Sequence, residues 1–228
     1  IYDKPVLYFP KFFHPDPTVD RQSGFLAPVV NNSSNYGQSF QIPYFKVISD
    51  RSDLTLTPRI FLDKNLLLAG EYRQANKESF FISDLSINKF IEGNSEGHVF
   101  ANLKGDTNDL NYEINIESVN NDSYFKSNKI QTALVDNPTL LNSYINIEKS
   151  DDENYFYSSV EVYEDLTKSR NDRYEYIYPN YGLSKFLNIG KNKNLPLEFT
   201  SEGFQKKYDT NVDETIIVND INFNSKSK

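Results

Sequence analysis

The sequence predicts an all-β protein built as an antiparallel up-and-down meander. Apolar and polar residues alternate with a period of two through most of the chain, and such alternation places one kind on each face of an extended strand. Short clusters of Asn, Asp and Ser separate the alternating runs, so each strand is expected to run antiparallel to the one before it. No apolar pattern with the helical period of about 3.6 residues persists over a useful length.

The first stretch, Ile1–Pro17, is rich in aromatic residues and proline. Proline fixes φ and removes a backbone donor, so it is tolerated at sheet edges and in extended connectors rather than inside a strand ladder. We therefore expect one short edge strand that leads into an extended connector ending near Arg21.

Residues 23–75 carry the most regular alternation in the chain. The expected strands are Ser23–Val30, Ser39–Phe45, Leu54–Leu62 and Leu66–Arg73, and the joining clusters are Asn31–Asn35, Ser49–Asp53, Asp63–Asn65 and Ala75–Lys77. In the third strand the apolar residues Leu54, Leu56, Ile60 and Leu62 fall on one face, opposite Thr55, Thr57 and Arg59. Pro28 and Pro43 interrupt the first two strands, and each removes one ladder donor. Such prolines are also common at ordinary edges and bulges.

Alternating runs continue to the end of the chain and bring the expected total to about a dozen strands. They lie at residues 81–87, 99–103, 111–117, 145–147, 156–162, 174–178, 195–199 and 217–223. The run at 111–117 is typical, since Asn111, Glu113, Asn115 and Glu117 occupy one face and Tyr112, Ile114 and Ile116 the other. We expect the first group to face water.

The connections between strands are unequal in length. Most are short, whereas the polar stretch Asn120–Asn142, broken at Asp136–Thr139, is long. Counting alternate turns of a meander predicts that Asn31–Asn35 and Asn120–Asn142 lie at one end of the sheet, and that Ser49–Asp53 and Asp151–Asn154 lie at the other.

Composition excludes some classes of protein. A net charge of −8 and a pI near 4.9 argue against binding of nucleic acid, which requires a basic surface. The 228 residues are 38% hydrophobic with a mean hydropathy of −0.62, and no apolar run approaches the length of a spanning helix. A β-barrel shows the membrane only every second side chain, so low hydropathy does not exclude a membrane. The absence of Met indicates an excerpt of a longer protein.

Residues suited to catalysis or metal binding are scarce. The two histidines are His14, beside prolines, and His98, beside a glycine; both are expected at the surface or in turns, without neighbours at metal-ligand spacing. The acidic cluster Asp151–Glu153 lacks the spacing of a calcium loop and is expected to be a solvated turn. With no cysteine present, neither a disulfide nor a thiolate site can form. We assign no catalytic residue, no cofactor and no metal, and expect no enzyme.

Several motifs resemble the LPS-assembly protein family (LptD, also called the organic solvent tolerance family) of the Gram-negative outer membrane. In the N-terminal third the matching motifs are Pro5–Phe13, Arg21–Pro28, Ile42–Phe45, Asp53–Arg59 and Glu71–Arg73, in the family's order and spacing. Further along, Asp122–Phe125, Val162–Thr167 and Arg173–Tyr176 are similar to that family. From Leu195 onward only the strand pattern matches.

The resemblance implies part of a large transmembrane β-barrel, incomplete and not closed in this excerpt. It implies that residues 1–17 are the last strand of a periplasmic jelly roll with its linker, and that residues 18–228 are the N-terminal portion of the barrel. The implied function is the assembly of lipopolysaccharide into the outer leaflet of the outer membrane, through a lateral gate. The implied partners are lipopolysaccharide, the plug lipoprotein LptE, the periplasmic bridge protein LptA and outer-membrane lipids.

The same resemblance implies a position for the gate. Pro28 and Pro43 match family positions at which the seam between the first and last strands is weak, and the gate-strand motif comprises Ser23, Gly24, Phe25 and Leu26. On pattern alone an alternative stays open: a soluble antiparallel β domain, such as a sandwich, that binds carbohydrate or protein. A two-sheet core containing Ile114, Ile116, Val160 and Val162 would identify the sandwich.

Overall fold

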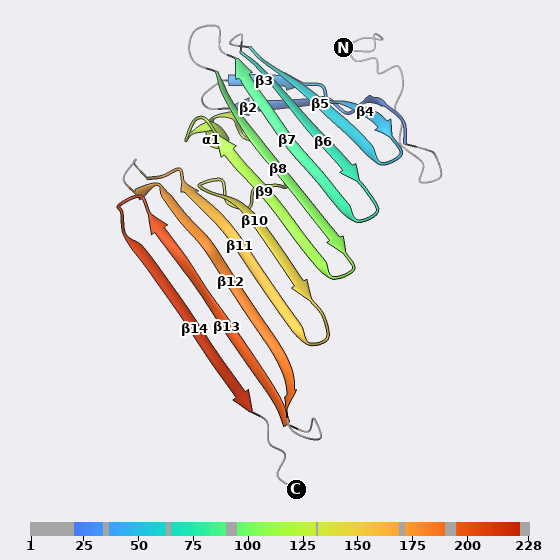
Figure 1. Ribbon diagram of the computed structural model, residues 1–228. Helices are drawn as coiled ribbons and strands as arrows, with labels where there is room; N and C mark the ends of the chain where they lie inside the picture. The colour runs from blue at the N-terminus through green and yellow to red at the C-terminus, as the bar shows by residue number, and fades with distance from the viewer. Residues whose placement is uncertain are drawn as a thin grey trace, which may run out of the picture.

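A computed structural model describes residues 21–33, 37–62, 65–89, 95–130, 132–168, 172–189 and 195–223. These residues form one antiparallel sheet, which confirms the predicted all-β meander (Figure 1). The strands are β1 (Gly24–Phe25), β2 (Val29–Ser33), β3 (Gly37–Gln41), β4 (Tyr44–Ser49), β5 (Ser52–Phe61), β6 (Leu66–Ala75), β7 (Ser79–Lys89), β8 (Glu96–Thr107), β9 (Leu110–Val119), β10 (Leu140–Ser150), β11 (Asn154–Asp165), β12 (Tyr174–Ile189), β13 (Leu195–Tyr208) and β14 (Asp213–Phe223). The helix is α1 (Tyr124–Asn128).

From β4 to β14 each strand pairs with the next one along the chain, and β1 pairs with β4. The hairpin of β2 and β3 joins this sheet through pairing of β3 with β5. If β1 with β2, and β3 with β4, are each counted as one interrupted strand, the described residues contain the dozen strands that the alternation predicts. β1 and β14 lie at opposite ends of the strand order, so the described sheet is not closed.

The sheet has two chemically distinct faces. We call the side that carries Arg59, Asp84, His98, Glu113 and Asn146 the polar face; the register places each of these beside polar-face residues of the neighbouring strands. The other side, the apolar face, carries exposed aliphatic residues along β5 to β11 and β14: Leu56, Ile60, Leu66, Leu68, Leu85, Ile87, Val99, Ile116, Ile145, Ile147, Val160, Ile217 and Ile221. The aliphatic side chains therefore form a continuous surface rather than a core.

Burial on the polar face is the reverse of what a soluble sheet shows. Most of the buried polar side chains lie there, including Ser39, Asp53, Arg59, Asn88, Glu96, His98, Asn102, Asn115 and Ser159. The sandwich alternative is not met, because Ile116 and Val160 are exposed, Ile114 and Val162 are only half-buried, and the described residues form a single sheet.

The predicted facing of β9 is confirmed, but one expected environment is wrong. Asn115 is only 6% exposed rather than in contact with water. Its Nδ2 donates to Asn142 O at 2.8 Å and to Glu117 Oε1 at 2.9 Å, and its Oδ1 accepts from Asn102 Nδ2 at 3.1 Å. Neighbouring polar side chains and the start of β10 cover this part of the face, so they replace the expected water.

The two ends of the sheet differ as predicted from the order of the turns. The connection from β9 to β10 lies at the same end as the turn between β2 and β3, and the turns from β4 to β5 and from β10 to β11 lie at the other end. We call the first the long-loop end and the second the short-turn end. The expected edge strand and linker at residues 1–17, and His14 within them, lie outside the described residues.

Candidate functional site

The first candidate region is the seam at the start of the sheet. Pro28 lies between β1 and β2, and Pro43 lies between β3 and β4, so each proline divides an expected strand into two short ones. β1 pairs with β4 only through Gly24 with Phe45 and Phe25 with Tyr44. Beyond these pairs a single bond continues the ladder, from the Leu26 N–H to Pro43 O at 2.8 Å.

The gate-strand motif packs along β4. The Val47 N–H donates to Ser23 Oγ at 2.9 Å, and the Phe25 ring meets the Tyr44 ring edge-on at 5.0 Å. Phe25 is nevertheless 76% exposed, and a Cβ added at Gly24 would meet no atom within 4 Å. The motif is thus held by few contacts at the open edge of the described sheet.

A third proline, Pro58, extends the weak line across the next strand. Pro58 lies in β5 between the point where pairing with β4 ends, at Leu56, and the point where pairing with β3 begins, at Arg59. Between these points the connecting bond is a long one, from the Ile42 N–H to Pro58 O at 3.4 Å. The signal in the sequence for this third break was the equal spacing of Pro28, Pro43 and Pro58.

The second candidate region is the connection from β9 to β10, which turns back onto the polar face. Tyr124 and Asn128 of α1 are both fully buried. The Tyr124 hydroxyl is hydrogen-bonded to Ser86 Oγ, and Asn128 Nδ2 donates to Glu96 Oε2 at 3.1 Å. Burial raises the pKa of Tyr124 to about 12, so the phenol is neutral at ordinary pH.

An apolar cluster reinforces this docking. The Phe125 ring stacks on Phe100 of the polar face with 5.5 Å between centroids, and Leu141 and Leu166 complete a buried cluster. Half-buried Val119, Ile130, Leu134 and Val135 pack against it. The sequence pattern predicts a polar loop here, although Tyr124, Phe125, Ile130, Leu134 and Val135 interrupt its polar residues.

The expectation for His98 is wrong. His98 is 4% exposed and lies inside β8, with Nδ1 2.9 Å from Ser86 Oγ and Nε2 3.1 Å from Asp84 Oδ1. The neighbouring Gly97 does not make a turn; a Cβ there would lie 2.4 Å from the backbone oxygen of Ser86, so glycine permits close strand approach. The Ser86 hydroxyl is also hydrogen-bonded to the Tyr124 hydroxyl of α1. The chain of polar groups from Asp84 through His98 and Ser86 therefore helps to hold α1 on the polar face.

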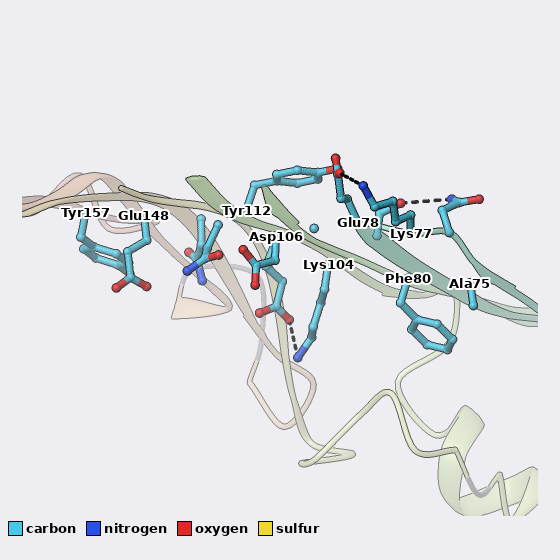
Figure 2. Close-up of a pocket in the computed structure, with 15 residues that line it drawn as sticks. Ala75, Lys77, Glu78, Phe80, Lys104, Asp106, Tyr112, Glu148 and Tyr157 are labelled. Atoms are coloured by element: carbon cyan, nitrogen blue, oxygen red, sulfur yellow. Dashed lines mark hydrogen bonds and ion pairs between the residues drawn. The ribbon is translucent and has the colours of Figure 1, made fainter. Parts of the chain in front are cut away.

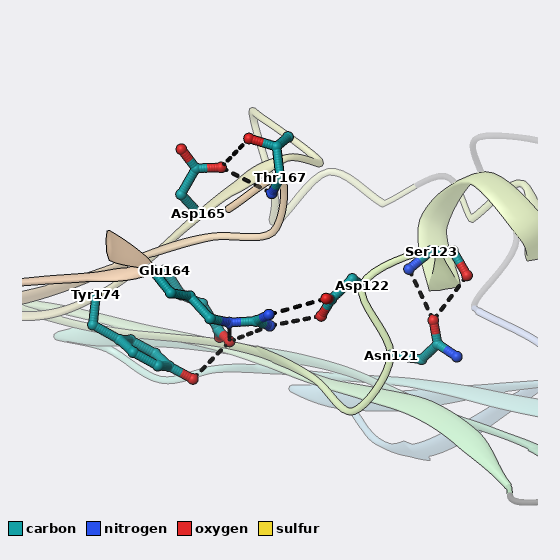
Figure 3. Close-up of polar contacts among 8 residues, drawn as sticks. Asn121, Asp122, Ser123, Glu164, Asp165, Thr167 and Tyr174 are labelled. Carbon is teal, nitrogen blue, oxygen red and sulfur yellow. Dashed lines mark hydrogen bonds and ion pairs between the residues drawn. The ribbon is translucent and has the colours of Figure 1, made fainter. Parts of the chain in front are cut away.

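A charged cluster ties the docked connection to the next long-loop turn (Figure 3). Arg173 donates to both carboxylate oxygens of Asp122, at 2.7 and 3.0 Å, and to Glu164 Oε1 at 2.8 Å. The Tyr174 hydroxyl donates to the same Glu164 oxygen at 2.8 Å. The hydrogen bonds from Arg173 lower the pKa of Asp122, and those to Asp122 raise the pKa of Arg173.

A hollow of about 580 Å³ lies at the short-turn end. Figure 2 shows Lys104, Glu148 and Tyr157 pointing to one side of the sheet and Tyr112 to the other. Lys104 Nζ lies 3.1 Å from Glu113 Oε1, which also accepts from the Tyr144 hydroxyl at 2.7 Å. The polar face therefore carries the Lys104–Glu113 ion pair at this end and is covered by α1 near the other.

Neither metal chemistry nor a helical span is indicated by the part of the chain that the structure describes. No group of three or more His, Cys, Asp or Glu side chains there could hold a metal ion. Nor is any helix in these ranges long and apolar enough to cross a membrane.

No family model matches the chain. It is similar to the LPS-assembly proteins LptD of Legionella pneumophila strain Lens (29% identity over 62% of this chain and 19% of the relative), Cupriavidus pinatubonensis (30%, over 54% and 15%) and Pseudomonas syringae pv. syringae (38%, over 35% and 8%). The chain thus spans about a fifth of the length of these relatives at most. A crystal structure of OccD1 (OprD) with two substitutions covers 82% of this chain and 60% of its own, at 11% identity and a TM-score of 0.35. The family resemblance predicted from the motifs is confirmed.

Proposed function

We propose that this chain, a relative of the LPS-assembly protein LptD, forms the first part of the wall of an outer-membrane β-barrel that assembles lipopolysaccharide into the outer leaflet. The observation that carries the proposal is the exposed apolar face combined with a covered, hydrogen-bonded polar face. In water this arrangement would leave the apolar surface unfavourably hydrated, whereas in a bilayer lipid covers it.

Strand length and connection length fit this placement. The shortest strands from β5 onward have 10 residues and β12 has 16, and about 9–11 residues of tilted strand cross the hydrocarbon region. Outer-membrane barrels combine short periplasmic turns with longer external loops. The long-loop end is then extracellular and the short-turn end periplasmic.

We infer that the gate lies at the β1 edge of the described sheet. Within a complete barrel, β1 would meet the last strand, which is not among the described strands. Pro28 removes a donor from the strand that meets that seam and Pro43 removes one from its neighbour, and Ser23, Gly24, Phe25 and Leu26 line the seam with few contacts. Weak pairing at this position would allow a lipid to leave sideways while its sugar head group stays in the polar interior.

The partners follow from the same role. In the complete protein, lipopolysaccharide would arrive from the periplasmic bridge protein LptA through the jelly roll that includes residues 1–17. The plug lipoprotein LptE would occupy the interior against the polar face, and outer-membrane lipids would cover the apolar face. The role is one of transport, with no catalytic residue assigned.

Cysteine labelling tests the membrane placement. Thr167 lies exposed at the long-loop end and Asp152 lies exposed at the short-turn end, and this chain has no native cysteine. In the full-length protein, with any other cysteine replaced, Thr167→Cys should react with an impermeant maleimide on intact cells. Asp152→Cys should react only after the outer membrane is opened. Equal labelling of both on intact cells would refute a spanning sheet, and reversed labelling would invert its orientation.

Restoring the missing donors tests the gate. Pro28→Ala combined with Pro43→Ala should strengthen the seam by about 0.5–1.5 kcal/mol for each hydrogen bond regained. Delivery of lipopolysaccharide to the surface should slow while the amount of folded barrel stays constant. Pro138→Ala, a proline change in the exposed part of the β9–β10 connection, is the matched control. Unchanged delivery in the double variant would show that the two prolines have only a structural role.

A further inference from the structure

The guanidinium of Arg59 is buried without a carboxylate partner among the described residues. Its side chain projects from β5 onto the polar face, and the residue is 4% exposed. No acidic side chain in the described ranges lies within ion-pair distance of it. Burial of an unpaired cation is costly, so its hydrogen bonds must offset a large loss of hydration.

Those bonds go to two different structural units. Arg59 Nε donates to Ser39 Oγ of β3 at 2.8 Å, and Nη1 donates to the backbone oxygen of Asn128, at the end of α1, at 2.6 Å. The guanidinium also lies over the Phe61 ring, 4.7 Å from its centroid. One side chain thus joins the β2–β3 hairpin to the docked connection.

The hairpin is otherwise held along one strand. Its ladder to β5 consists of the pairs Ser39 with Phe61, Phe40 with Ile60 and Gln41 with Arg59, flanked by bonds from the Leu62 N–H to Gln38 O at 3.0 Å and from the Ile42 N–H to Pro58 O at 3.4 Å. A second link to the connection comes from Lys129, whose Nζ donates to Asn32 O of β2.

We propose that Arg59 is a positioning residue that couples the β2–β3 hairpin to the docked α1. This rests on the proposed function, in which the hairpin adjoins the lateral gate. Coupling between two binding events is reciprocal, so displacement of α1 loosens the hairpin and movement of the hairpin weakens the seat of α1. Access to the interior and opening of the seam are thereby linked through Arg59, beside the second link from Lys129.

Amide hydrogen exchange on the full-length protein, in membranes or nanodiscs, tests the coupling. Arg59→Lys keeps the charge but loses the planar fork that reaches two partners at once. Loss of a hydrogen bond to a charged group should speed exchange about tenfold or more in both Val29–Gln41 and Tyr124–Asn128. Arg73→Lys is the control, because Arg73 lies on the same face in β6 and donates to Asp53 instead. It should leave both segments unchanged.

A second pair of variants separates coupling from general destabilisation. Ser39→Ala removes only the hairpin partner and should speed exchange more in the hairpin than in α1. Phe125→Ala, a variant that undocks α1, should speed amide exchange in the hairpin when Arg59 is present. In the Arg59→Lys background the same change should speed exchange in the hairpin no further. Acceleration of only one segment by Arg59→Lys, or additive effects in the double variant, would overturn the coupling.

The exchange measurement is independent of lipid transport, so failure of the coupling and failure of the proposed function are distinguishable. If Arg59→Lys loosens both segments but delivery of lipopolysaccharide is unaffected, the coupling stands and the gate assignment fails. If delivery changes while the exchange of both segments stays native, the coupling is wrong.

Discussion

Ile145→Lys is expected to destabilise the membrane-inserted sheet by about 2–4 kcal/mol, the cost of a lysine on the lipid face near the bilayer midplane. Ile145 lies in the middle of β10, is 49% exposed on the apolar face, and has Ile114 and Val160 directly opposite it on the two neighbouring strands. The ammonium would find no polar partner among these side chains. The fraction of folded barrel, measured by the gel shift of unheated samples, should fall sharply.

Asn146→Lys is the matched control on the adjacent position. Its side chain lies on the polar face between Glu113 and Ser159, and its Oδ1 has no hydrogen-bond partner in the structure. A lysine there can pair with the Glu113 carboxylate, so assembly should be close to native. Equal losses in the two variants would contradict the assignment of the faces, and tolerance of Ile145→Lys would indicate that water, rather than lipid, covers the apolar face.

The strands and their faces could be predicted because strand alternation is a local property. A residue's neighbours in the sequence decide which face it occupies, as the opposite positions of Asn115 and Ile116 show. The breaks at Pro28 and Pro43 were predictable for the same reason, since the missing N–H belongs to the residue itself. Pro58 was harder to notice, because it falls inside a run whose apolar residues alternate without interruption.

The docked connection could not be predicted, because its contacts join residues that are far apart in the sequence. α1 has only 5 residues, too few to show a helical repeat, and its burial depends on Phe100 and Ser86 of other strands. His98 was placed in a turn because of its glycine neighbour, whereas the glycine is required by the approach of β7. The aromatic pair Tyr124 and Phe125 within a polar stretch was the one local clue.

Phe125→Ala is expected to release this connection from the polar face without unfolding the sheet. Phe125 is 8% exposed and stacks on Phe100, and a buried Phe→Ala change costs about 3–5 kcal/mol. The remaining attachments of α1 are the edge-on contact of the Tyr124 ring with His98 and hydrogen bonds that each contribute about 0.5–1.5 kcal/mol net, so the loss is a large part of the docking energy. The strand ladders do not pass through α1 and should persist.

Two measurements check this result in the full-length protein. Amide exchange over Tyr124–Asn128 should rise to the rate of an unstructured chain while β7 and β8 stay protected, and cells should become more permeable to large antibiotics because the interior is less covered. Lys126→Ala is the control, since Lys126 lies on the exposed side of the same helix. Release would be refuted by native exchange in Phe125→Ala. Loss of protection in β7 and β8 together with α1 would instead show that the connection is part of the cooperative core, because a merely docked segment leaves the sheet beneath it intact.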